Sequence, residues 1–120
     1  MQQIGALFYV AWGVLHLYAA YQVYSRLGAR QPAGMLQGRI YQSAWNLAFF
    51  ALAAIAVALV FNWGNSPLGF WLNLTLTSVT DIGFIIFVLW PGYLPRWPGW
   101  LGPALWVLAL IFSSLAQLAL

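Results

Sequence analysis

The sequence predicts an all-α integral membrane protein, an up-down bundle of four transmembrane helices in which residues 1–120 form a single transmembrane domain. Two observations predict it. Hydrophobic residues make up 64% of the chain and charged residues 4%, and the apolar residues gather in four long segments. A water-soluble domain carries about 25% charged residues, so this chain lacks the side chains to cover a surface that faces water. Most of its apolar side chains are therefore expected to face lipid.

Each apolar segment is long enough to span a bilayer, which takes about 20 residues in a helix. The expected spans are residues 5–24, 41–61, 69–90 and 101–119. Glycine and proline, which interrupt helices, are concentrated in the segments between them. Because these connections are short, helices that follow one another in the sequence are expected to be neighbours.

The first and last spans each need a separate argument. Met1–Ile4 carries no positive charge and no small-residue cleavage pattern follows the span at 5–24, so that span is expected to be a retained helix rather than a signal peptide. In the fourth span Pro103 falls within the first turn, where a helix tolerates proline. Both segments are therefore counted as spans.

The arginines predict how the chain crosses the membrane. Arg26, Arg30 and Arg39 lie in the first loop and Arg96 in the third, and no other part of the chain has a basic side chain. By the positive-inside rule, loops 25–40 and 91–100 are cytoplasmic and both termini lie outside. The expected location is an inner membrane of the bacterial type.

Composition also excludes several classes of function. The chain has no cysteine, so it has no disulfide, thiolate metal site or cysteine nucleophile. Four arginines spread over two loops do not form the dense basic patch of a nucleic-acid-binding protein. Zinc takes three or four ligands, and only one histidine and one acid are present, so neither a metal nor a cofactor is expected. The bilayer is the one partner that the composition requires.

Small and polar residues mark the faces that turn inward, because hydrophobicity does not separate inside from outside in lipid. On the third span Asn73, Thr77 and Asp81 are spaced four residues apart, which places them on one helix face. On the second span Gln42 and Asn46 share a face in the same way. The ordinary interpretation of the uncharged members is that they hydrogen-bond one helix to another.

His16 and Asp81 require a different interpretation, because they are the only histidine and the only acidic residue. Placing an aspartate at the centre of a membrane helix costs about 2.5–3.5 kcal/mol, so such a residue is by default a candidate functional group with a partner. Both residues lie past the middle of helices that run inward, and at 1.5 Å per residue their depths differ by about 2–3 Å. We expect them to form a pair.

The function expected from this pair is a membrane-embedded site for a lipophilic small molecule. His16 and Asp81 are its catalytic candidates, as an acid/base pair or a polar anchor, since such chemistry needs only two positioned titratable groups. The expected ligand-binding residues are the aromatic and polar side chains placed near them, Trp12, Trp45, Asn46, Thr77 and Trp106. Whether the protein is an enzyme is left open.

Two alternatives remain beside it. The pair can simply fix the register of two helices in a structural or accessory subunit, or a single acid in each protomer can serve a small dimeric proton-coupled carrier. The small residues Ala44, Ala48 and Ala51 are expected to contact a partner helix in these cases. Homo- or hetero-oligomers are compatible with both alternatives.

Overall fold

The computed structural model describes all 120 residues and contains helices but no strand. Four long helices account for most of the chain, and short π-helical, 3₁₀-helical and α-helical segments extend or join them. In chain order these elements are α1 (Gln2–Gln22), η1 (Val23–Gly28), α2 (Met35–Val60), η2 (Asn62–Gly64), α3 (Pro67–Phe84), η3 (Ile85–Leu89), α4 (Arg96–Gly99) and α5 (Leu101–Leu118).

Four continuous helical stretches are long and apolar enough to cross a membrane: Gln2–Gly28, Met35–Gly64, Pro67–Leu89 and Leu101–Leu118. The prediction of an all-helical chain with four long apolar helices is confirmed. The first two stretches are longer than expected, because hydropathy marks only the apolar part of a helix. The residues around Arg39 are polar, yet they belong to α2, which begins at Met35.

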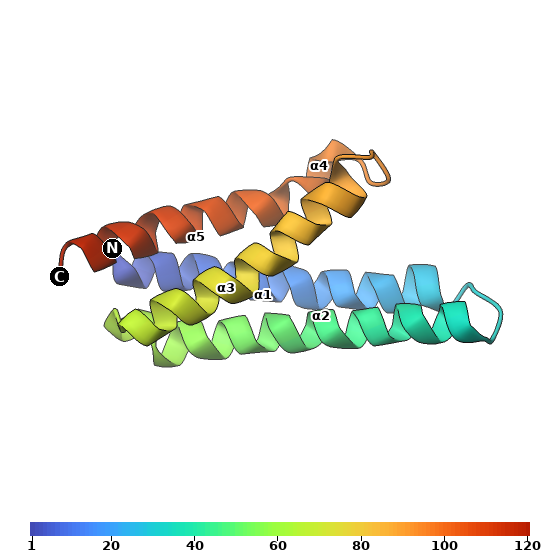
Figure 1. The fold of residues 1–120 in the computed structure, drawn as a ribbon, viewed down its shortest axis with the longest axis horizontal. Coiled ribbons are helices and arrows are strands. Elements are labelled where there is room, and N and C mark those ends of the chain that lie inside the picture. Colours follow the sequence, from blue (N-terminus) through green and yellow to red (C-terminus); the bar gives the residue numbers. More distant parts are fainter.

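Helix α1 lies at the centre of the arrangement (Figure 1). It packs along α2 on one side and along α5 on the other, and these are the two most extensive helix contacts in the chain. Helix α3 crosses obliquely, starting beside the end of α2 and finishing near α4 and the start of α5. As a result, α2 and α3 diverge along their length.

Both termini lie at one end of the molecule with the turn between α2 and α3, and the two other connections lie at the opposite end (Figure 1). All four arginines lie in the helices and loops at that opposite end of the molecule. The molecule is elongated, with extents of 53 × 26 × 17 Å. A hydrocarbon core is about 30 Å thick, so the long axis has room for the core and both polar interfaces.

Small residues allow α1 and α2 to approach closely. A Cβ atom on Gly13 would lie 2.8 Å from the carbonyl oxygen of Ala51, so glycine is required there. The inner face of α2 consists of small side chains that pack inside the chain, namely Ala44, Ala51, Ala54 and Ala58. The expectation that Ala44 and Ala51 face a partner protein is therefore wrong, because α1 already covers them.

Large apolar side chains cover the outside of all four long helices, including Trp45, Phe49, Val79 and Ile111. In water such a surface would be unfavourable, since soluble monomers rarely expose large continuous apolar patches. In lipid it is the ordinary exterior of a helical protein. Most of the buried residues are instead small or polar, and the large apolar or aromatic side chains among them are Tyr9, Trp12 and Leu89.

Candidate functional site

The inner faces of α1 and α3 bring the only histidine and the only acid together. On α3, Asn73, Thr77 and Asp81 are all buried on one face. On α1, Trp12 and His16 are buried one turn apart. His16 Nε2 lies 3.3 Å from Asp81 Oδ1, and the Asp81 side chain is fully buried. The predicted pairing of His16 with Asp81 is confirmed.

Trp12 is the third member of this centre. Its indole Nε1–H donates a hydrogen bond to Asp81 Oδ2 at 2.9 Å. Its ring also stacks on the imidazole of His16, with the ring centroids 3.9 Å apart and the planes 25° from parallel. Trp12 therefore fixes both partners of the pair: it satisfies one carboxylate oxygen and covers one face of the imidazole.

The partners of His16 indicate which of its two ring nitrogens carries a proton. Its Nδ1 lies 2.7 Å from the carbonyl oxygen of Trp12, and a carbonyl only accepts, so Nδ1 carries a proton. Nε2 faces Asp81 Oδ1. If the imidazole were neutral and the carboxylate ionised, two lone pairs would face each other there. A proton on either Nε2 or Oδ1 would remove this repulsion.

The contact between Nε2 and Oδ1 is electrostatic rather than a well-directed hydrogen bond. Its 3.3 Å separation is within the range of an ion pair, but Oδ1 has no hydrogen-bond partner of good geometry. Oδ2, in contrast, is fully engaged by Trp12. The carboxylate thus has one fixed oxygen and one oxygen with spare hydrogen-bonding capacity, which is the oxygen that faces the imidazole.

Helix α5 closes another side of the centre. A Cβ atom on Gly102 would lie 3.2 Å from His16 Cε1, so the backbone of α5 packs directly against the imidazole edge. His16 is 8% exposed as a result. Three helices therefore surround the pair, which leaves it shielded from the outside of the protein.

Thr77 and Asn73 continue the polar face of α3 away from the pair. The Thr77 hydroxyl donates to the Asn73 carbonyl at 2.6 Å, within the same helix. The Asn73 amide donates to the Ala54 carbonyl at 3.1 Å and to Asn62 Oδ1 at 2.9 Å. Asn73 therefore ties α3 to the end of α2, which agrees with the interpretation that the uncharged residues of this face hydrogen-bond one helix to another.

The other expected ligand-binding residues lie apart from the pair. Trp106 on α5 is half-buried and donates through Nε1 to Ser78 Oγ at 3.1 Å, which joins α5 to α3. Trp45 is 77% exposed and points outward from α2. Asn46 is also exposed, on the side of α2 that faces α3. The structure brings only Trp12 into contact with His16 and Asp81, and ligand binding by the others stays a prediction.

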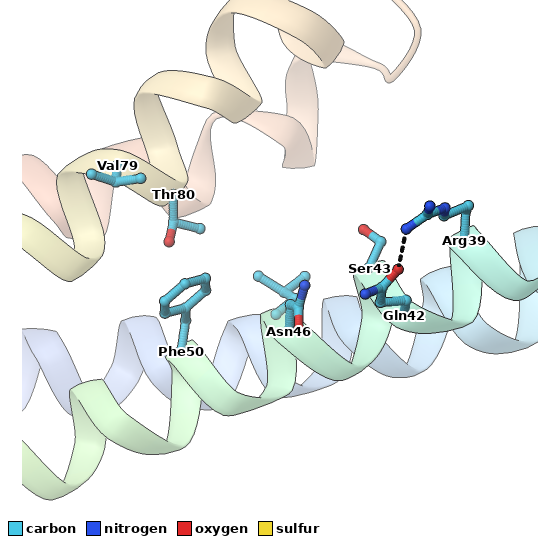
Figure 2. Close-up of a pocket in the computed structure, with 8 residues that line it drawn as sticks. Arg39, Gln42, Ser43, Asn46, Phe50, Val79 and Thr80 are labelled. Atoms are coloured by element: carbon cyan, nitrogen blue, oxygen red, sulfur yellow. Dashed lines mark hydrogen bonds between the residues drawn. The ribbon is translucent and has the colours of Figure 1, made fainter.

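An open groove of about 410 Å³ lies where α2 and α3 diverge (Figure 2). Its lining comes from both helices and consists of Arg39, Gln42, Ser43, Asn46, Leu47, Phe50, Val79 and Thr80. Val79 and Thr80 immediately precede Asp81, whose side chain points to α1 instead. The groove and the buried pair therefore share α3 as their common wall, although the pair itself does not line the groove.

A second open cavity, of about 460 Å³, lies on the outside of α5 and is lined by Trp100, Pro103, Ala104, Val107 and Leu108. It offers no polar side chain that would orient a ligand. No group of three His, Cys, Asp or Glu side chains is close enough to hold a metal ion. Of these two cavities, only the groove between α2 and α3 has polar side chains in its lining that could orient a ligand.

One further buried polar group, the hydroxyl of Tyr9, was not among the predicted site residues. The hydroxyl of Tyr9 on α1 is buried and has no hydrogen-bond partner of good geometry. Tyr9 packs among Ala6, Ala58 and Ala109 in the small apolar core. Its position one helical turn before Trp12 was evident in the sequence, but the burial of its hydroxyl was not.

Comparison with known proteins gives no relative from which a role can be transferred. No protein-family model matches the chain, and neither a curated protein nor a solved structure matches it. The function therefore has to be argued from the geometry described above.

Proposed function

We propose that this chain is an up-down four-helix protein of a bacterial-type inner membrane, and that it binds a lipophilic small molecule at a site governed by His16 and Asp81. The observation that carries the proposal is the buried cluster of Trp12, His16 and Asp81, in which an imidazole nitrogen lies 3.3 Å from a carboxylate oxygen. A buried ionisable residue in a membrane helix is a functional hypothesis by default.

The proposed chemistry is that the pair holds a single proton between Nε2 and Oδ1 and transfers it, or donates a hydrogen bond from it. Asp81 Oδ1 lacks a well-directed partner, so the proton is not locked into a strong bond. A polar group of a ligand that reached α3 would find an acid and a base already positioned side by side, as general acid–base catalysis requires. The same pair would serve as a polar anchor if no reaction takes place.

The groove beside α3 supports the ligand part of the proposal. It is concave, it combines apolar and polar walls, and Thr80 on its wall is the neighbour of Asp81. Ligand sites are typically apolar clefts with a few placed polar groups.

Native mass spectrometry of the protein released from mild detergent tests this proposal. The wild-type protein should carry a defined lipophilic mass, and His16→Ala and Asp81→Asn should reduce its occupancy at least about tenfold, as expected for loss of a charge-assisted contact. Unchanged occupancy in both variants would refute it. Circular dichroism of each variant provides the control for folding.

The proposed orientation has its own test, made simple by the absence of cysteine. Ala33 and Gly64 are exposed at opposite ends of the molecule, and each can be replaced with cysteine. An impermeant maleimide added to intact cells should label Gly64→Cys, whereas Ala33→Cys should react only after permeabilisation. The reverse pattern would overturn the assignment of loops 25–40 and 91–100 to the cytoplasm.

A second candidate, a structural or accessory subunit, is favoured by one observation: neither cavity is lined by His16 or Asp81. In that case the pair pins α1 to α3, and buried polar pairs do specify geometry in some proteins. This structural role predicts that Asp81→Leu lowers the stability of the fold, while a bound lipophilic mass, if present, stays unchanged. A strictly monomeric protein in mild detergent would further exclude the dimeric carrier.

A further inference from the structure

The groove between α2 and α3 changes character along its length. Arg39, Gln42, Ser43 and Asn46 supply polar side chains toward the start of α2, and Phe50 and Val79 supply apolar ones further along (Figure 2). Thr80 also lines that further part, but its hydroxyl donates to the Leu76 carbonyl of its own helix at 2.8 Å. From Arg39 to Phe50 the helix rises about 16 Å at 1.5 Å per residue. The groove is therefore amphipathic along its axis, with a polar end and an apolar end.

Arg39 is a cation without a counter-ion in the chain. Its Nη1 donates to the neutral Oε1 of Gln42 at 2.9 Å. The only carboxylate side chain, that of Asp81, is buried against His16 and Trp12. The guanidinium thus retains unused N–H donors, held in place by Gln42 at the polar end of the groove.

Two more polar side chains face the same end. Ser43 and Asn46 line the groove, and neither bonds to another lining residue (Figure 2). Gln42 uses its carbonyl oxygen for Arg39, so its amide N–H₂ remains free to donate. The polar end therefore offers several donors around one positive charge, which suits an oxyanion head group.

We infer that this groove binds an acyl-chain lipid with an anionic head group, whose phosphate lies against Arg39 and whose chain runs past Phe50 and Val79. The inference deepens the proposed function and rests on it, since it names the class of the lipophilic ligand. In the proposed membrane orientation the groove runs in the same direction as a membrane lipid, because Arg39 near the start of α2 would lie at head-group depth and Phe50 in the hydrocarbon region. The positive charge of Arg39 favours a lipid whose head group is anionic.

The probe is dioleoyl phosphatidic acid, with dioleoyl phosphatidylcholine as the zwitterionic lipid of equal chain length. Delipidated protein in mixed micelles is examined by native mass spectrometry. The wild type should retain phosphatidic acid about tenfold more than phosphatidylcholine, because charge-assisted hydrogen bonds to arginine distinguish the two head groups. Equal retention of the two lipids would overturn the inference.

Matched variants locate the site. Arg39→Gln should abolish the preference, whereas Arg26→Gln, which removes an arginine outside the groove, should preserve it. Val79→Trp should reduce retention by filling the apolar end, and Ile82→Trp, also exposed on α3, should not. A preference that survives Arg39→Gln, or that Arg26→Gln removes equally, would contradict binding in this groove.

The same set of variants separates this inference from the proposed function. If His16→Ala and Asp81→Asn lose a lipophilic mass that Arg39→Gln keeps, the proposed function stands and the groove assignment fails. If inorganic phosphate at the same concentration displaces the lipid, the site recognises the anion alone and the acyl chain is not held. If no variant changes any bound mass, both proposals fail.

Discussion

His16 Nε2 lies 3.3 Å from Asp81 Oδ1, so the single imidazole and the single carboxylate side chain of this protein meet inside the helix bundle. Trp12 bonds the other carboxylate oxygen, and its backbone carbonyl accepts from His16 Nδ1. These three contacts join both ionisable side chains to one tryptophan. They also allow substitutions that separate its chemistry from its structure.

Asp81→Asn should preserve the fold while removing the ionisable carboxyl group. The asparagine oxygen can accept from Trp12 and its amide can donate to His16 Nε2, so both partners stay satisfied and the free energy of unfolding should fall by less than about 1 kcal/mol. Asp81→Leu leaves both partners unpaired, and each buried unsatisfied group costs about 1–3 kcal/mol. Thermal unfolding in detergent measures the difference, and equal losses for the two variants would contradict the described hydrogen bonds.

Gly13→Ala should destabilise the contact between α1 and α2. The added methyl group would lie 2.8 Å from the Ala51 carbonyl oxygen and would also clash with Ile55. Overpacking of this kind costs about 1–3 kcal/mol. The matched control is Gly83→Ala on α3, where nothing lies within 4 Å of the new Cβ; it should be neutral or stabilising by up to about 1 kcal/mol. The same unfolding experiment compares the two.

Asn73→Ala should weaken the junction of α2 and α3. It removes two donated bonds and leaves Asn62 Oδ1 and the Ala54 carbonyl with fewer partners in a buried setting. The expected loss in the free energy of unfolding is about 1–3 kcal/mol. Thr75→Ala on the exposed face of the same helix should change it by less than about 0.5 kcal/mol. Similar effects at both positions would show that the Asn73 bonds do not stabilise the fold.

The sequence was sufficient to predict the apolar helices and the meeting of His16 with Asp81. Four long apolar segments and a charged content of 4% predict a lipid-facing exterior, and a single histidine and a single acid at similar depth have only each other as a charged partner. The depth argument depends only on the rise per residue, which is nearly constant in helices. The pairing of His16 with Asp81 could therefore be predicted without the tertiary structure.

The rotation of α2 was not predictable in the same way. Its Gln42 and Asn46 face was expected to turn inward, but they line an open groove and the small residues around Ala51 face α1 instead. Between apolar helices, close packing of small side chains competes with the burial of polar ones. The groove itself arises from the oblique course of α3 (Figure 1), and no local pattern encodes a crossing angle.

The most direct test of the central claim is the ¹⁵N magnetic resonance spectrum of the single histidine side chain, recorded for the wild type and for Asp81→Asn. The account predicts a proton on Nδ1 in both proteins, because the Trp12 carbonyl accepts from it. It further predicts that Nε2 in Asp81→Asn is an unprotonated acceptor, whereas in the wild type it shares a proton with Asp81. A neutral imidazole protonated on Nε2 and bare on Nδ1 in the wild type would contradict the shared proton, and with it the proposed acid/base role of the pair.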